Sequence, residues 1–425
     1  MGHNDLVSSR VRVARGETAA REIEAMLGGS GTVVRLVDPG KPIEIDEQVV
    51  PEDFTGVLVN TSGSTGTPKT VMLSRKALMT AAQAGIDRLG GPGEWANPLP
   101  GWYVAGLMTR VRAMIVGRSY TEVSPHLEGL QPARSRSYIS LVPAQLHQTL
   151  SNAEIRQTLA SYAAVLIGGA RLDRVLRTHA EQSGITIVTT YGMSETCGGV
   201  VYDGIPLDGV MIDLIDGAAS PLHQEEELSH SVRCRQIHVS DPQKREYDDT
   251  RSHVTTIVPT SAAYEGPNGQ ETTREGRILI TTPTIFDGYL GDPELTATVR
   301  YGDSLLTHDR GRLTDNQLTI LRRIDDVVQS GGKNVDLSQI QLLLDKEFPH
   351  QVACFAEPDP VWGSTVIVAS AGPNLDEIWD KLQHHLDSAA RPRGILRVDA
   401  LPRTSSGKID REQVAKMWRN RGERA

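Results

Sequence analysis

Cysteine and aromatic side chains are scarce in this chain of 425 residues, which has 3 cysteines and an aromatic content of 4%. Cys197, Cys234 and Cys354 lie far apart in the sequence and form no C-x-x-C pair. This pattern argues against a disulfide framework and is typical of the reducing cytoplasm. The 40 glycines and few aromatic rings fit an α/β enzyme with many loops better than an aromatic-packed β-sandwich.

Long hydrophobic runs and an excess of positive charge are also absent. No apolar stretch approaches the roughly 20 residues that cross a bilayer, and residues 1–17 lack the apolar segment of a signal peptide. The formal net charge is −9, which argues against general nucleic-acid binding because phosphate backbones require positive protein surface. We therefore expect a cytoplasmic protein with neither a membrane nor a nucleic-acid partner.

Short apolar runs alternate with helical patterns over the first half of the chain. Each run has four to seven residues, is rich in β-branched side chains and is bounded by Gly, Ser or Pro, which is typical of buried parallel strands. The runs lie at 55–60, 137–142, 163–167 and 185–189. We expect an α/β fold, and the length indicates more than one domain.

We predict a large N-terminal domain over residues 1–324 and a small α+β domain over residues 325–425. A polar segment at 215–275 interrupts the large domain and is interpreted as a surface excursion with a hairpin near 233–239 and 254–258. In the small domain the sequence predicts helices at 337–348 and 375–389 and strands at 351–357 and 364–369.

A strand that runs into a loop of glycines and hydroxyl residues is the strongest motif of the sequence. Residues 57–70 read VLVNTSGSTGTPKT, followed by VMLSRKALMTAA, which we expect to be helical. Glycine backbone N–H groups and hydroxyls can converge on an anion, and Lys69 adds a positive charge. Pro68 occupies the position of the glycine that precedes lysine in a Walker loop, so that class of phosphate loop is excluded.

The segment TSGSTGTPK resembles the phosphate loop of the ANL adenylate-forming enzymes, which include acyl-CoA synthetases, adenylation domains and luciferases. Further segments resemble the other motifs of this superfamily in the same order along the chain. They are IGGA at 167–170, TYGMSET at 190–196, LTHDRG at 306–311, RIDD at 323–326, SGGK at 330–333 and LPRTSSGKIDR at 401–411. The resemblance implies the ANL fold, in which a large mixed-sheet domain with flanking helices carries a small mobile domain.

The resemblance implies a binding site for ATP and Mg²⁺. The phosphate side consists of Thr61, Ser62, Gly63, Ser64, Thr65, Gly66, Thr67 and the catalytic Lys69. The adenine and metal side consists of Gly168, Gly169, Ala170, Tyr191, Gly192, Ser194, Glu195 and Thr196, and Asp309 and Arg323 complete the site. Tyr191 is expected to stack on the purine, Ser194 and Thr196 to contact phosphate oxygens, Glu195 to hold Mg²⁺ and Asp309 to bind the ribose hydroxyls. His308 and Arg322 stand where glycine is usual.

The same resemblance implies two half-reactions. A carboxylate attacks the α-phosphorus of ATP and releases pyrophosphate, and a thiol, expected to be that of CoA, then attacks the acyl carbon of the adenylate. Lys408 is expected to catalyse the first step. Rotation of the small domain about a hinge at Asp325 then brings Gly331 and Gly332 beside the path of the thiol.

Two segments are more particular than the superfamily pattern, LPGWYVAGL at 99–107 and YGMSETCGGVVYDGIPLDGV at 191–210. They resemble the actinobacterial o-succinylbenzoate–CoA ligases of menaquinone biosynthesis. The expected acid-site residues are Trp102, Tyr103, Gly106, Arg112, Cys197 and Gly198. Arg112 is the candidate partner of a second substrate carboxylate and Arg110 its competitor.

Other substrates stay open at this point. Trp102 stands where related sequences carry histidine, and an aryl or medium-chain acid is an alternative. Another alternative is an adenylation enzyme that loads a carrier protein. Homodimers are frequent in the superfamily, so a homodimer is a further expectation.

Overall fold

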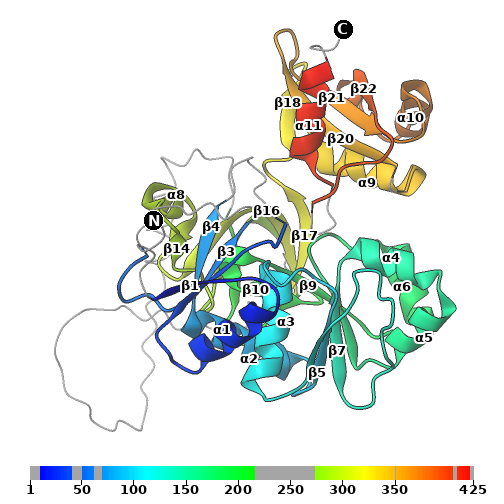
Figure 1. Cartoon of the computed structure of the whole chain (residues 1–425). Helices are drawn as coiled ribbons and strands as arrows, with labels where there is room; N and C mark the ends of the chain where they lie inside the picture. The colour runs from blue at the N-terminus through cyan, green and yellow to red at the C-terminus, as the bar shows by residue number, and fades with distance from the viewer. Residues whose placement is uncertain are drawn as a thin grey trace, which may run out of the picture.

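The computed structural model describes residues 10–40, 50–61, 69–215, 273–349, 351–404 and 409–421. Within these residues, three sheets form a large body from strands up to residue 323, and a fourth forms a small body from strands after residue 326 (Figure 1). The predicted hairpin at 233–239 and 254–258, the loop residues 62–67 and Lys408 lie outside the described residues.

The large body is built on three sheets. In strand order, the first contains β1 (Val11–Ala14), β2 (Val33–Leu36), β3 (Gly56–Asn60), β4 (Thr70–Ser74) and β14 (Gly288–Tyr289). The second contains β11 (Ile205–Pro206), β10 (Gly198–Tyr202), β9 (Ile187–Met193), β8 (Ala164–Ile167), β7 (Ser137–Leu141), β5 (Glu94–Asn97) and β6 (Tyr120–Glu122). The third contains β12 (Met211–Ile215), β13 (Thr273–Thr281), β16 (Ser304–Thr314) and β15 (Arg300–Tyr301), with β17 (Gln317–Arg323) paired to β16.

Helices cover the sheets because their apolar faces match the buried strands. The helices α1 (Glu17–Leu27), α2 (Arg75–Arg88) and α3 (Val104–Ile115) share a core with the first sheet and β10. The helices α4 (Pro143–Leu150), α5 (Ala153–Ala160) and α6 (Arg174–Gln182) pack with a face of β7 and β8 (Figure 1). In α2, buried residues recur three and four positions apart, which is the spacing of one helix face.

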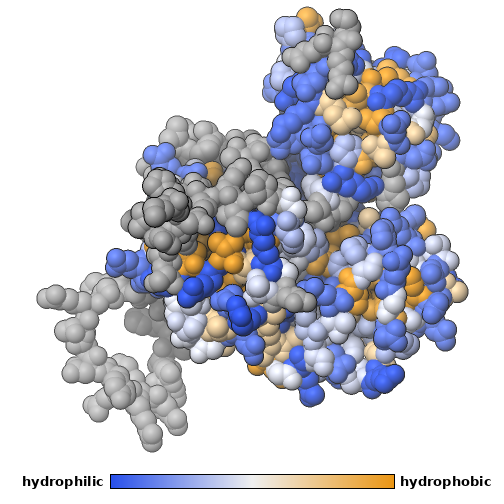
Figure 2. Space-filling view, in the orientation of Figure 1, coloured by the Kyte–Doolittle hydropathy of each residue, from blue (hydrophilic) through white to orange (hydrophobic). Residues whose placement is uncertain are grey.

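The small body has its own sheet and its own core. Its strands, in sheet order, are β19 (Lys333–Asp336), β18 (Val327–Ser330), β21 (Gly363–Ser370) and β20 (Val352–Asp359), with β22 (Gly394–Arg397) paired to β21. The helices α9 (Leu337–Glu347), α10 (Leu375–Leu382) and α11 (Arg411–Arg419) pack on this sheet. In the space-filling view the small body stands as a separate mass whose visible face is largely polar (Figure 2).

The four predicted strands of the large body are present as β3, β7, β8 and β9. As expected, β2 and β3 pair in parallel, as do β7, β8 and β9. The α/β fold class is therefore confirmed. No helix among the described residues combines the length and the apolar character needed to cross a membrane.

Two local predictions were wrong. Residues 71–74 belong to strand β4, and the helix begins only at Arg75, where the side chain of Ser74 accepts a hydrogen bond from Ala77 N–H. Strand β4 pairs antiparallel with β3, so the phosphate loop connects the two strands of a hairpin. The helix expected at 375–389 ends at Leu382, and a short 3₁₀ turn follows at Ser388–Ala390.

Candidate active site

The β3–β4 hairpin holds both ends of the predicted phosphate loop. Thr61 N–H donates to Lys69 C=O at 2.8 Å, and the Thr70 hydroxyl donates to the Asn60 side chain at 2.9 Å. These contacts close the base of the loop, so Thr61 and Lys69 lie opposite each other at its two ends.

A tyrosine that the sequence analysis missed links Lys69 of the predicted phosphate side to Glu195 of the predicted metal side. The Tyr289 hydroxyl donates to Glu195 Oε1 at 2.7 Å, and Lys69 Nζ lies 5.2 Å from the centre of the Tyr289 ring. Burial raises the pKa of Tyr289, and the neighbouring Glu195 carboxylate raises it further. The phenol therefore stays protonated and serves as a donor. Tyr289 lies on strand β14 (Gly288–Tyr289), and no motif of the sequence analysis includes it.

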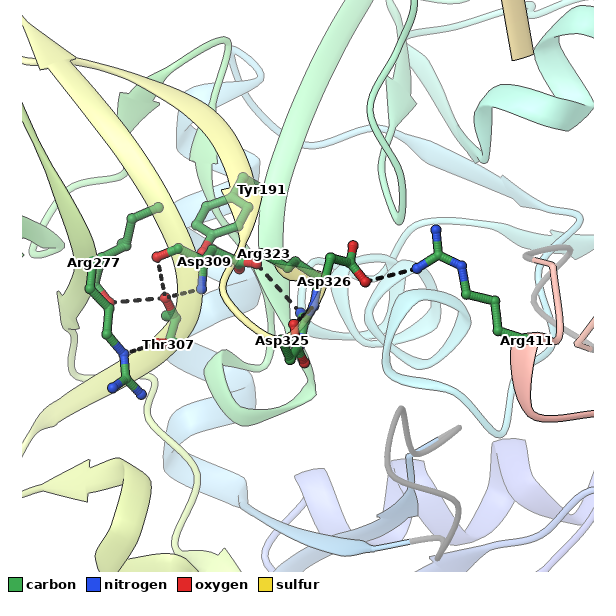
Figure 3. A network of polar contacts seen from close by, with 9 residues as sticks. Tyr191, Arg277, Thr307, Asp309, Arg323, Asp325, Asp326 and Arg411 are labelled. Atoms are coloured by element: carbon green, nitrogen blue, oxygen red, sulfur yellow. Dashed lines mark hydrogen bonds and ion pairs between the residues drawn. The ribbon is translucent and has the colours of Figure 1, made fainter. Parts of the chain in front are cut away.

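The predicted ribose carboxylate, Asp309, lies at the centre of a polar network (Figure 3). Its side chain is 9% exposed, and its Oδ2 accepts a hydrogen bond from the Tyr191 hydroxyl at 2.7 Å. Its Oδ1 faces Arg323 Nη1 at 3.4 Å, and its backbone N–H donates to the Thr307 hydroxyl. The nearby Arg277 donates to Thr307 C=O. These contacts fix the orientation of the carboxylate on strand β16.

The network continues into the predicted hinge. Arg323 donates two hydrogen bonds to Asp325, at 2.8 and 2.7 Å, and the next residue, Asp326, forms an ion pair with Arg411 of α11 at 2.8 Å. Burial alone would raise the pKa of Asp325, but the hydrogen bonds and charge of Arg323 outweigh it and lower the pKa. A continuous series of polar contacts therefore joins Asp309 to the hinge (Figure 3).

The two predicted adenine-side segments meet because β8 and β9 are parallel neighbours. Gly168 follows β8 and packs so tightly against Thr190 that an added Cβ would lie 2.6 Å from the threonine hydroxyl. Gly169 has a φ of +80°, which favours glycine at this turn before Ala170. The turn therefore lies beside the β9 segment that carries Tyr191.

The 3₁₀ turn Ser194–Thr196 presents its three side chains differently. Thr196 is 0% exposed, and its hydroxyl contacts the backbone carbonyls of Met193 and Gly198. This hydroxyl is enclosed and engaged, so it holds the turn rather than reaching a phosphate. The Ser194 hydroxyl makes no hydrogen bond with a described residue.

Helix α3 and strand β10 carry the predicted acid-site residues. Trp102 and Tyr103 precede α3, with their ring centres 6.3 Å apart. Gly106, in the first turn, packs against the backbone of Pro100. On β10, a Cβ at Gly198 would lie 3.6 Å from the side chain of Met108, so α3 and β10 face each other here.

Cys197 packs between these elements rather than serving as a nucleophile. Burial raises the pKa of its thiol well above the usual range, and the Asp287 carboxylate adds to the shift. A thiol held protonated is a poor nucleophile. Its backbone is left-handed, with a φ of +54°, where the chain turns from Thr196 into β10.

The two arginines on α3 differ in their partners. Arg110 forms an ion pair with Glu122 and lies over the Tyr120 ring. Arg112 is 4% exposed, donates to the Tyr202 hydroxyl at 3.1 Å and lies 5.2 Å from the centre of the Trp95 ring. Its Nε makes no hydrogen bond, and no described carboxylate pairs with it. A buried guanidinium without an acid partner is costly unless a ligand supplies one.

The structure does not bring the predicted thiol-path residues to the other site residues. Gly331 and Gly332 form the turn between β18 and β19, with φ values of +58° and +75°. Gly331 N–H donates to Trp362 C=O within the small body, and β18 runs away from the large body (Figure 1). The segment that contains Lys408 is flanked by a bridge between Arg403 and Ile409.

Comparison with known proteins places this arrangement in a family. Residues 17–290 match the family of AMP-binding enzymes, and residues 342–408 match the AMP-binding enzyme C-terminal domain. The chain belongs to the AMP-binding enzymes, the class that its fold and its motifs define.

Two relatives in this family are named for a specific substrate. The chain is 30% identical over 423 residues to a probable 2-succinylbenzoate–CoA ligase of Mycobacterium tuberculosis, covering 93% of this chain and 94% of the relative. It is 26% identical over 373 residues to the 2-succinylbenzoate–CoA ligase of Enterococcus faecalis, covering 84% and 69% of the two chains.

Solved structures share the fold. The o-succinylbenzoate CoA synthetase of Bacillus subtilis, in complex with its acyl-adenylate intermediate, has a TM-score of 0.64 and 21% identity, with 95% of this chain and 82% of that chain covered. An amide bond synthetase of Marinactinospora thermotolerans has a TM-score of 0.63 and 21% identity, with 96% and 80% covered. Similarity at this level of identity shows the ANL fold that the sequence motifs predicted.

Proposed function

We propose that this enzyme joins o-succinylbenzoate to CoA in two steps, with ATP as the activating substrate. The main observation for a dicarboxylate is the guanidinium of Arg112, which is buried and has no carboxylate partner among the described residues. A second carboxylate on the substrate would supply that partner. The names of the relatives from M. tuberculosis and E. faecalis support the same acid.

In the first step, the substrate carboxylate attacks the α-phosphorus of ATP and pyrophosphate leaves. The loop that ends at Lys69 would hold the departing phosphates, and Asp309, held by Tyr191, would accept hydrogen bonds from the ribose hydroxyls. Catalysis of this kind consists mainly of positioning and charge stabilisation. Lys408 would stabilise the charge that develops at the phosphoryl group.

Glu195 is suited to hold Mg²⁺. One of its carboxylate oxygens accepts the Tyr289 hydroxyl, and the other makes no hydrogen bond with a described residue. Carboxylate oxygens are preferred ligands of Mg²⁺, and the ion, when bound, would neutralise phosphate charge. Tyr289 would orient the carboxylate, and Lys69 would add a second positive charge nearby.

In the second step, the thiol of CoA attacks the acyl carbon and AMP leaves. We propose that residues 1–324 and 325–425 act as two domains with a hinge at Asp325, so that one adenylate meets two sets of residues in turn. Gly331 and Gly332 would then approach the acyl group only after rotation of the small domain. ATP and CoA are intracellular substrates, and the buried free thiols of Cys197 and Cys354 agree with the cytoplasm.

Arg112 would bind the second carboxylate, since α3 carries Met108 beside Gly198 and Arg112 one helical turn further along the same face. Replacing Arg112 with glutamine should raise the KM for o-succinylbenzoate by about 10- to 150-fold, equivalent to roughly 1.5–3 kcal/mol for a charged hydrogen bond. The KM for ATP should stay unchanged.

The assay is ATP-dependent consumption of CoA, with pyrophosphate release followed in parallel, for o-succinylbenzoate, benzoate, a coumarate, octanoate and acetate. The matched control is Arg110→Gln, because Arg110 is the neighbouring arginine whose charge Glu122 already pairs. Preference of the wild-type enzyme for a monocarboxylate would contradict the proposed acid. Equal losses in the two variants would contradict the role of Arg112.

A further inference from the structure

An ion pair joins the two bodies at the hinge. Arg322 is the penultimate residue of strand β17 in the large body, and Asp336 is the last residue of β19 in the small body. Arg322 Nη1 lies 3.4 Å from Asp336 Oδ2. Residues 324–326 link β17 to β18, the first strand of the small body, so this contact spans the segment about which the proposed rotation takes place.

The two oxygens of Asp336 have separate partners. Oδ1 caps helix α9, where it accepts the N–H groups of Ser338 and Gln339 and the hydroxyl of Ser338. Oδ2 faces Arg322. The Asp336 side chain is 8% exposed, so its orientation is set by the cap and not by the arginine. Arg322 therefore meets a carboxylate that is already fixed in place.

The neighbouring charges at the hinge have other partners. Arg323 pairs with Asp325 and Asp309, and Asp326 pairs with Arg411. Arg322 does not compete for these carboxylates, and Asp336 has no second ion pair with a described residue. Glycine, which is usual at position 322 in the resembling motif, could not make this contact.

The observed orientation suits the proposed first half-reaction. In Figure 1 strand β18 lies in the small body, apart from β3, β4 and β9 of the large body, and the Gly331–Gly332 turn connects β18 to β19. Meanwhile Arg411, three residues after Lys408, pairs with Asp326 at the hinge (Figure 3). Rotation about Asp325 would separate Arg322 from Asp336, because the two residues belong to different bodies.

We propose that Arg322 is a positioning residue that holds the small body in the adenylate-forming orientation through Asp336. This inference rests on the proposed two-step function. The arginine is 39% exposed, so solvent weakens the pair, and the expected shift in the ratio of the two orientations is about two- to fivefold. The pair would favour adenylate formation and slow the release of the small body for thioester formation.

The test separates the half-reactions in single-turnover experiments on the full chain. Arg322→Gly and Asp336→Asn should each slow adenylate formation two- to fivefold and leave thioester formation from supplied acyl-adenylate equal or faster. Asparagine retains the cap of α9 through its side-chain oxygen but removes the charge. The double variant should add little to either single variant, since both remove the same contact.

The matched control is Arg312→Gly, which removes an exposed ion pair with Glu275 on strands β16 and β13 of the large body. This variant should leave the ratio of the two rates unchanged. Equal slowing of both half-reactions by Arg322→Gly, or the same shift in the Arg312 variant, would overturn the proposal.

A second readout does not depend on the acid. Fluorescent labels on Thr178→Cys in α6 and Asp376→Cys in α10, with Cys234 replaced by serine, would report the distance between the two bodies. With ATP present, Arg322→Gly should lower the ratio of molecules with the wild-type distance to all other molecules about two- to fivefold. An unchanged distance distribution in Arg322→Gly would overturn the role of Arg322. If the distribution shifts but the enzyme does not activate o-succinylbenzoate, only the proposed substrate is overturned.

Discussion

Single side chains in this enzyme act through partners that are remote in the sequence. Tyr289 is separated from Glu195 by 94 positions and from Lys69 by 220, yet it contacts both. Tyr191 is separated from Asp309 by 118 positions, and its pKa is raised, first by burial and then by the Asp309 charge. Each tyrosine remains a donor that orients a carboxylate.

Removal of the Tyr289 hydroxyl should loosen Glu195 and therefore weaken the metal site. Tyr289→Phe should raise the concentration of Mg²⁺ that gives half-maximal pyrophosphate release by about 3- to 10-fold, equivalent to roughly 0.7–1.4 kcal/mol for one lost hydrogen bond. A magnesium titration of the wild type and the variant measures this. Tyr301→Phe is the control, since that hydroxyl donates to the carbonyl of Thr298 outside the site. An unchanged magnesium dependence would contradict the orienting role.

His308 should make stability depend on pH. Burial lowers its pKa below the ordinary value of 6.5, and the charge of Arg277 lowers it further. The unfolded chain therefore binds a proton at a higher pH than the folded protein does, and the His308 contribution to stability falls as pH drops below about 6.5. Urea unfolding at pH 7.5 and 5.5 should show a smaller loss of unfolding free energy in His308→Asn than in the wild type. Equal losses would contradict this prediction.

At the scale of elements, close backbone packing between paired strands shapes the site. Strands β9 and β10 form an antiparallel pair on either side of the Ser194–Thr196 turn. Within this pair Gly192 lies directly against the backbone of Gly198. The close approach lets the chain reverse within a few residues, with Tyr191 on β9 and Cys197 immediately before β10.

Gly192→Ala tests this crossing. An alanine Cβ would lie 2.0 Å from the Gly198 carbonyl oxygen, so the two strands would have to separate. We expect a loss of about 1–3 kcal/mol in unfolding free energy, as for other overpacked sites, together with a loss of adenylation activity. Chemical denaturation and pyrophosphate release measure the two effects. Gly117→Ala is a comparison at a glycine with no neighbour in contact, although its φ of +60° carries a cost of its own. A native-like Gly192 variant would contradict the packing argument.

At the scale of the whole molecule, two bodies with separate cores share one short connection. The strands of the large body end at Arg323 and those of the small body begin at Val327. Each body buries its own apolar side chains. Separate cores permit rotation of one body without unpacking of the other. This arrangement suits a reaction whose two steps require different residues at one adenylate.

Lys408→Ala tests whether the two half-reactions use different orientations of the small domain. Adenylate formation should fall by at least about 100-fold, as expected for removal of a charge that stabilises a developing anion. Thioester formation from supplied acyl-adenylate should remain within a few-fold of the wild type. Single-turnover assays of each half-reaction measure both rates. Equal loss in the two steps would contradict the rotation of the small domain.

Local sequence patterns predicted the fold class and the strands β3, β7, β8, β9, β20 and β21, because short apolar runs and turn residues act over a few neighbouring positions. They failed at residues 71–74, where β-branched and helix-forming residues are mixed and pairing with β3 decided the outcome. The order of the motifs was also sufficient to indicate adenylate-forming chemistry. All these features are properties of short segments.

The tertiary structure alone decided which polar groups are engaged and which are left without a partner. Arg110 and Arg112 are two positions apart on α3, but Arg110 pairs with Glu122, whereas buried Arg112 has no carboxylate partner among the described residues. The Thr196 hydroxyl turns inward, and Tyr289 joins Lys69 to Glu195. Such pairings depend on distances between segments far apart in the chain, which packing of the sheets sets and local sequence does not encode.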